Sequence, residues 1–145
     1  MLDTGPYLKA ALFCESVIEG KDGVLSLIRV VDRLMVTAAG PKALPDMPAT
    51  EHTLKLVLML ISGRAQGSAE VAVSVEPPGE PEESLWRTDV FLQGEDQGAN
   101  LIAHVPITLK SQGLYWFRIR LDGEHLTSLP FRVIYRRVVP GTPIR

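Results

Sequence analysis

The chain has 145 residues, a formal net charge of −2 and a hydrophobic fraction of 46%. A chain of this length fits one domain and can bury a core without a metal or a disulfide as a staple. The high apolar fraction and the near-zero charge exclude an intrinsically disordered chain. Composition therefore predicts one folded domain and assigns it no chemistry.

The single cysteine, Cys14, and the N-terminal residues indicate the cellular compartment in which the protein is expected. One cysteine cannot form an intramolecular disulfide, which suits a reducing cytoplasm. The N-terminal residues lack a basic stretch followed by a long apolar run, so we expect no signal peptide. Phe13 is too large for a lipoprotein cleavage site, and the longest apolar run, 56–61, is too short to span a bilayer. We therefore expect a soluble cytoplasmic protein with no transmembrane segment.

The N-terminal third predicts two strands and a loop. Residues 8–18 and 24–36 are strand-like and flank a turn at 19–23 that contains two glycines. Glycine and aspartate tolerate the positive φ angles that hairpin turns require. Segment 24–36 is also compatible with a helix, but its β-branched residues favour a strand. Residues 39–49 contain three prolines, which predicts a long surface loop.

The central third predicts three more strands. Residues 52–61 and 85–92 are strand candidates, and residues 70–76 place valines at three successive odd positions. Such alternation puts one apolar face toward a core. Residues 76–83 contain three prolines and four glutamates, which predicts an exposed acidic connection.

The C-terminal third predicts the last three strands. Residues 101–109 and 115–121 are apolar at every odd position, and residues 129–135 complete the set. The pair Asp122-Gly123 is the second hairpin signal. The tail, residues 139–145, contains two prolines and a glycine, and we expect it to be loosely held.

These eight strands predict an all-β fold, a single antiparallel β-sandwich over residues 1–138, with a closed β-barrel as the alternative. Residues 113–117 resemble the tyrosine-corner region of immunoglobulin-like sandwiches, where a tyrosine at the start of a strand ties its hydroxyl to nearby backbone. That tyrosine is Tyr115 here. Phe117 stands where an antibody domain has a cysteine, so only the architecture is implied.

The pair Phe13-Cys14 and the segment 23–28 (Gly-Val-Leu-Ser-Leu-Ile) resemble the start of a family of small bacterial β-sandwich proteins. That family opens with a Phe-Cys motif and a Leu-Ser-Leu-Ile hairpin. Residues 113–117 and 129–133 are similar to its C-terminal hairpin, so the resemblance spans the chain. The family is uncharacterised, so the resemblance implies a fold and no functional residue.

A search for catalytic motifs is negative. The chain has no Gly-x-Ser-x-Gly elbow, no His-Glu-x-x-His, no Cys-x-x-Cys and no phosphate-binding glycine loop. His52, His104 and His125 lie in different segments, which indicates surface residues rather than a metal site. Cys14 has no base nearby in the sequence, which indicates a buried, inert thiol. We therefore expect no catalytic residue, no metal and no cofactor.

Charge is distributed unevenly along the chain. Residues 76–96 hold seven acids and one base, whereas residues 113–145 hold six arginines and two acids. Side chains that alternate with the buried positions of the last predicted hairpin should share its outer face. We call this outer face "the arginine face", and it consists of Trp116, Arg118, Arg120 and Arg132. This arginine face could hold a carboxylate-rich partner, or its arginines could pair with acids on neighbouring strands. The acidic isoelectric point and the scarcity of lysine argue against nucleic acid.

A second candidate surface lies in residues 54–61, which are apolar on both faces. Leucines fill the even positions, while Val57, Met59 and Ile61 fill the odd ones. A strand that is apolar on both sides is either covered by a loop or packed on another subunit. The proline-rich loop at 39–49 could provide that cover.

The leading interpretation is a non-enzymatic protein-interaction module that binds another protein or itself. The two surfaces just described would carry the binding. The alternative is a ligand-binding sandwich for carbohydrate, or for lipid with calcium. Trp86 and Trp116 could stack on a sugar ring. The acids at 95–96 and 122–124 could offer oxygen ligands to calcium, although two short acidic pairs supply fewer than that ion takes.

Overall fold

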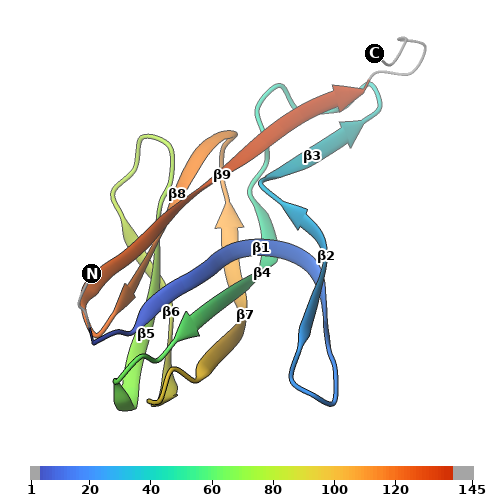
Figure 1. Ribbon diagram of the computed structural model, residues 1–145. Helices are drawn as coiled ribbons and strands as arrows, with labels where there is room; N and C mark the ends of the chain where they lie inside the picture. The colour runs from blue at the N-terminus through green and yellow to red at the C-terminus, as the bar shows by residue number, and fades with distance from the viewer. Residues whose placement is uncertain (1–3, 139–145) are drawn as a thin grey trace.

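The computed structural model describes residues 4–138, and within that range every regular element is a strand (Figure 1). The predicted tail at 139–145 lies outside the described residues. No helix that could cross a membrane occurs in residues 4–138. The strands, in chain order, are β1 (Tyr7–Glu19), β2 (Leu25–Val31), β3 (Arg33–Ala39), β4 (Thr50–Ile61), β5 (Gln66–Glu76), β6 (Glu83–Gln93), β7 (Gly98–Leu109), β8 (Gly113–Leu121) and β9 (Glu124–Val138).

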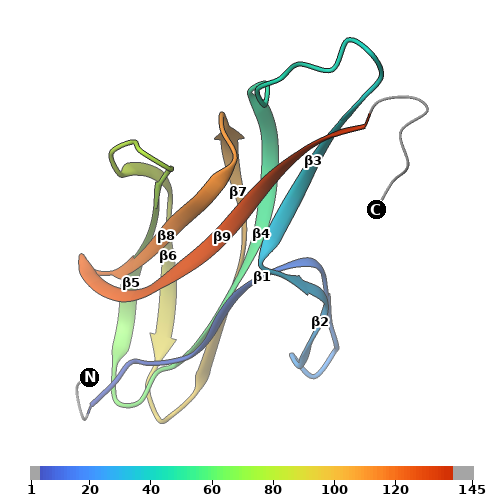
Figure 2. The same cartoon turned by 90° about the horizontal axis from the view of Figure 1, so that it is seen from above.

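The strands form two sheets that face each other (Figures 1 and 2). Sheet A has four strands in the order β2-β1-β4-β7, and sheet B has five in the order β3-β9-β8-β5-β6. Every neighbouring pair is antiparallel except β3 and β9, which run parallel. The predicted β-sandwich is therefore confirmed.

The core lies between the sheets and is filled by alternate residues of both. Val71, Val73 and Val75 of β5 are fully buried, as are Phe117 and Ile119 of β8. The period-two pattern predicted these positions, because successive side chains of a strand point to opposite faces. The rings of Phe13, Phe117 and Phe131 meet edge to face at the centre.

The predicted strand at 24–36 is wrong, because this segment forms two strands in different sheets. Asp32 separates β2, which pairs with β1 in sheet A, from β3, which pairs with β9 in sheet B. The core-facing positions change from odd to even at this point, since Val31 packs on the core before it and Leu34 after it. The chain crosses between the sheets here, which raises the strand number from eight to nine.

Two of the predicted local contacts are present. Asp122 and Gly123, between β8 and β9, have φ angles of 49° and 82°, as a two-residue hairpin turn requires. Tyr115, 1% exposed, donates its hydroxyl hydrogen to the carbonyl oxygen of Ser111 at 2.5 Å. This bond ties the start of β8 to the turn before it.

The two predicted connections are also present as loops. Residues 40–49 join β3 to β4, and Met47 of this loop is buried in the core. Tyr135 of β9 donates a hydrogen bond to the carbonyl oxygen of Leu44 at 2.6 Å. The loop thus closes one end of the sandwich.

Candidate functional site

The predicted arginine face is the outer face of sheet B. Trp116, Arg118 and Arg120 alternate along β8 with buried Tyr115, Phe117 and Ile119. Arg132 of β9 lies opposite Leu114 of β8, which places it on the same face. The structure therefore brings all four predicted side chains to one surface.

Two of these arginines are already paired within the chain. Arg120 Nη1 lies 2.7 Å from Glu82 Oε2, and Arg118 Nη1 lies 3.1 Å from Glu76 Oε1. Glu82 belongs to the acidic connection at 77–82, which folds back onto β5 and β8, and it also accepts a hydrogen bond from the Ser74 hydroxyl. Arg120 and Ser74 together hold the pKa of Glu82 below its usual value, so this carboxylate is charged at neutral pH.

The remaining two members of the arginine face differ in exposure. Trp116 is half-buried between Glu76 of β5 and Pro130 of β9. Arg132 is exposed and takes part in none of the ion pairs found among residues 4–138. Since Arg118 and Arg120 are neutralised, Arg132 is the member of this face best placed to meet an external charge.

The second predicted surface is the outer face of sheet A. Val57 has no exposed area, although it points away from the core, and Met59 and Ile61 are half-buried. The side chains that flank Val57 are Leu12 of β1 and Ile102 of β7. Val57 is therefore shielded by neighbours in its own sheet. The loop at 40–49, which the sequence suggested as its cover, leads into the first residue of β4 and lies at the opposite end of that strand.

Apolar side chains on this outer face come from all four strands. In β2, Ile28 and Val30 are 42% and 59% exposed and lie opposite Ser16 and Cys14 of β1. We call the set "the apolar face", and it consists of Leu12, Cys14, Ile28, Val30, Val57, Met59 and Ile102. The sequence interpretation missed Leu12, Ile28, Val30 and Ile102, although Ile102 is an apolar residue among the polar alternates of β7.

A groove opens beside the apolar face where β1 leaves β4. The two strands pair as far as Cys14 and Lys55, and then β1 curves away toward β2 (Figures 1 and 2). We call the space between residues 15–19 of β1 and residues 50–54 of β4 "the fork". A cavity of about 410 Å³ lies there, with a floor and a rim made by Phe13, Cys14, Glu15, Val31, Arg33, Leu34, His52, Thr53, Leu54, Lys55, His104 and Phe131.

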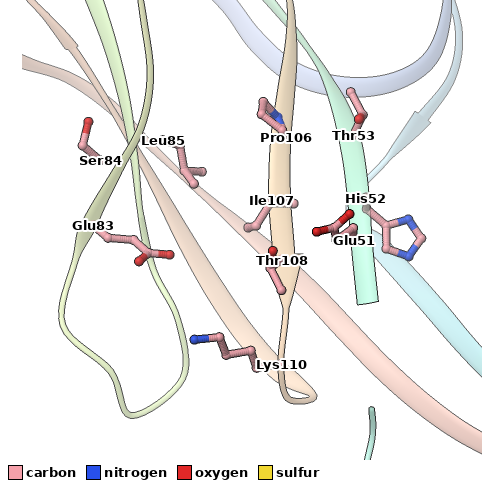
Figure 3. A pocket seen from close by; sticks show the side chains of 10 residues that line it. All are labelled: Glu51, His52, Thr53, Glu83, Ser84, Leu85, Pro106, Ile107, Thr108 and Lys110. Carbon is pink, nitrogen blue, oxygen red and sulfur yellow. The ribbon is translucent and has the colours of Figure 1, made fainter. Parts of the chain in front are cut away.

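A larger, open cleft of about 560 Å³ lies between the start of β6 and the end of β7 (Figure 3). Glu83 at the start of β6 and Lys110 after β7 point toward each other across the cleft, and Glu51 lies on β4 beyond β7. None of the ion pairs in the described part of the chain joins these groups. Neither tryptophan lines this cleft, so it lacks a platform for a sugar ring.

The three histidines come from three different strands, although His52 and His104 both line the cavity at the fork. His52 and His104 lie on opposite faces of sheet A, and His125 is within hydrogen-bond distance of Ser128 in sheet B. No group of three or more His, Cys, Asp and Glu side chains within residues 4–138 is arranged to hold a metal ion. Cys14 is 3% exposed, and burial raises the pKa of its thiol.

The acids proposed as calcium ligands sit in turns. Glu95 and Asp96 have positive φ angles between β6 and β7. Asp122 accepts a hydrogen bond from the Glu70 amide through Oδ1, at 2.8 Å, and donates its own amide hydrogen to the Glu70 carbonyl. The contacts of Asp122 thus stabilise the β8–β9 turn against β5.

Comparison with known proteins gives a family and no activity. No curated protein matches the chain. One similar solved structure is "Pseudomonas fluorescens alkylpurine DNA glycosylase AlkC bound to DNA containing an abasic site analog", with 14% identity and a TM-score of 0.40. The match covers 69% of this chain and 27% of that one, so it spans less than a third of the glycosylase and supports no statement about function. A family model described as "Family of unknown function (DUF6941)" matches residues 9–134, and the chain therefore belongs to that family.

Proposed function

We propose that this chain is a non-enzymatic module that binds a partner protein through the apolar face of sheet A. The observation that carries the proposal is the exposure of Ile28 and Val30 on the edge strand β2, next to apolar side chains of β1, β4 and β7 that are half-buried or, for Cys14 and Val57, buried. Contiguous exposed apolar side chains commonly mark a surface that a protein partner covers. Burying them on a partner would contribute about 25 cal/mol per Å² of apolar area.

The apolar face is a better candidate than the arginine face. Binding through Arg118 or Arg120 would compete with the ion pairs that each already makes with Glu76 and Glu82. An exposed ion pair contributes little to the stability of a fold. A carboxylate of a partner nevertheless gains less binding energy from an arginine that is already paired than from an unpaired one. Arg132 is left as a single free charge at the far side of the sandwich.

The test is the double variant Ile28→Glu/Val30→Glu. Both side chains are exposed, so the change leaves the core intact while placing charge on the apolar face. We expect the wild-type chain to capture a protein from a native extract, and the double variant to bind the same purified partner about tenfold or more weakly. Light scattering shows whether that partner is a second copy of the chain.

The matched control is Phe91→Glu. Phe91 is 66% exposed on β6, so it tests an apolar side chain on sheet B that is more exposed than Ile28 or Val30. We expect its binding to equal that of the wild type. Equal binding by the double variant and the control would remove the apolar face from consideration.

We also propose that the protein works in a reducing compartment such as the bacterial cytoplasm. Cys14 is its single cysteine and is buried, so the fold uses no disulfide. The raised pKa keeps this thiol protonated at neutral pH, which supports a packing role rather than a nucleophilic one.

A further inference from the structure

The fork leaves two stretches of strand without a neighbour on one side. Residues 50–54 of β4 pair with β7 but with no described strand on the β1 side. Residues 15–19 of β1 pair with β2 and with no described strand on the β4 side, where the Lys55 side chain reaches the Glu15 carbonyl. Unpaired strand edges present backbone N–H and C=O groups that another extended chain can pair with.

The fork also has an apolar floor. Phe13, Leu54 and Phe131 at the floor are 3%, 8% and 1% exposed. The cavity above them, about 410 Å³, falls within the range of about 300–1,000 Å³ that ligand-binding pockets occupy. An apolar side chain that alternates inward from an added strand would fill this space.

One cation stands at the fork without a carboxylate. Lys55 Nζ donates to the backbone carbonyl of Glu15 across the fork, at 3.4 Å. The Glu15 and Arg33 side chains are paired with Arg29 and Asp32, whereas Lys55 takes part in no ion pair of the described residues. A carboxylate on an added strand could therefore form an ion pair with Lys55.

We propose that the fork accepts an extended segment of the partner protein, which adds as a strand along residues 50–54 of β4. The segment places an apolar side chain on the floor and an aspartate or glutamate beside Lys55. This inference rests on the proposed function and specifies the chemistry of the partner. The fork is continuous with the apolar face through Cys14, so one partner can cover both.

The two outer edges of sheet A are less suited to an added strand. Pro106 interrupts the outer edge of β7, and proline cannot donate to a ladder. Arg29, with a φ angle of 55°, distorts the outer edge of β2. Such features discourage pairing at an edge, and residues 50–54 carry neither.

The experiment selects ligands for the purified full chain from displayed random peptides of about ten residues, long enough to span the edge at 50–54. We expect the selected peptides to alternate apolar residues and to contain an acidic residue. Amide hydrogen exchange, read residue by residue, should slow at residues 50–54 when a selected peptide is bound. Protection at β2, β3, β6 or β7 instead, or the absence of any binding peptide, would overturn the proposal.

Charge variants test the role of Lys55. Lys55→Glu should weaken peptide binding about tenfold or more, and Lys55→Met should weaken it less. Lys110→Glu is the matched control, because Lys110 is an exposed lysine in the turn after β7 and outside the fork. Equal affinities of Lys55→Glu and Lys110→Glu would contradict the acidic contact.

The two proposals fail in distinguishable ways. If the partner protein depends on Ile28 and Val30 but leaves residues 50–54 unprotected, the proposed function stands and strand addition is wrong. If it protects residues 50–54 but tolerates Ile28→Glu/Val30→Glu, the fork is the site and the apolar face is not. If neither region responds, both proposals are wrong.

Discussion

Three phenylalanine side chains from three strands hold the two sheets together at the residue scale. The ring centroid of Phe13 in sheet A lies 5.0 Å from that of Phe117 and 5.3 Å from that of Phe131, both in sheet B. Edge-to-face packing of this kind adds about 0.5–1.5 kcal/mol per pair beyond the burial of apolar area. Phe13 is the ring common to both contacts between the sheets, and Phe117 is its nearer partner in sheet B.

Replacing Phe117 with alanine should lower the free energy of unfolding by about 3–5 kcal/mol, because a fully buried ring leaves a cavity between the sheets. Phe91→Ala is the control, since its 66% exposed side chain lies on the outer face of sheet B and should cost about 0.5 kcal/mol or less. Urea denaturation of the two variants measures the difference. Similar losses from both would mean that the three-ring cluster does not anchor the core.

The alternation of odd and even positions along a strand predicted which side chains share a face of the sheet, but not which residues those side chains contact. Arg118 and Arg120 could be placed on the outer face because they alternate with Phe117 and Ile119. Their partner Glu82 could not be found, since a proline-rich connection carries no periodic signal and its path depends on tertiary contacts. The apolar face of sheet A was predicted only along β4, at Val57, Met59 and Ile61, for a related reason. The neighbours of Val57 come from β1 and β7, whose order in the sheet a single sequence does not specify.

At the scale of elements, the connection at 77–82 is held to sheet B by Glu82. Its carboxylate bonds to Arg120 on β8 and to Ser74 on β5, which keeps its pKa below the usual value. A group whose pKa is lowered by folding stabilises the fold above the pKa it has when unfolded. That stabilisation is lost as the pH falls through the lower pKa of the folded state.

Glu82→Gln should therefore destabilise the protein at about pH 7 and have a smaller effect in acid, where the wild-type carboxyl becomes protonated as well. Urea denaturation of wild type and variant across the acid range measures the difference in unfolding free energy. Glu80→Gln is the control, because Glu80 is an exposed acid in the same connection and makes none of the ion pairs found in residues 4–138. A constant difference between wild type and Glu82→Gln at all pH values would contradict the role of the charge.

The boundary between β2 and β3 shows why one element was misjudged. Residues 24–36 contain no glycine after Gly23 and no proline, so nothing in their composition ends a strand. The signal that the sequence does contain is a change in the core-facing positions at Asp32: the odd-numbered Val31 packs on the core before it, and the even-numbered Leu34 and Val36 pack on the core after it. A single unbroken strand cannot put both sets into one core, so a change of sheet could have been inferred.

For the whole molecule, the shared core predicts that both sheets unfold together. Trp86 and Trp116 lie in sheet B, so tryptophan fluorescence reports on that sheet, whereas far-ultraviolet circular dichroism reports on both. We expect the two signals to give coincident urea transitions, since each sheet leaves its apolar side exposed without the other. Two separate midpoints would mean that sheet A and sheet B are independently stable.

The parallel pairing of β3 with β9 has a consequence for protein synthesis. The four strands of sheet A all precede β8 and β9 in the chain, so every strand of that sheet is synthesised before the last two strands of sheet B. β3 is also made early, but its single hydrogen-bonded neighbour is the last strand of the described chain. The apolar side chains of Leu34 and Val36 therefore lie on a strand without its hydrogen-bonded neighbour until β9 has been made, and an unpaired strand edge can pair with other chains.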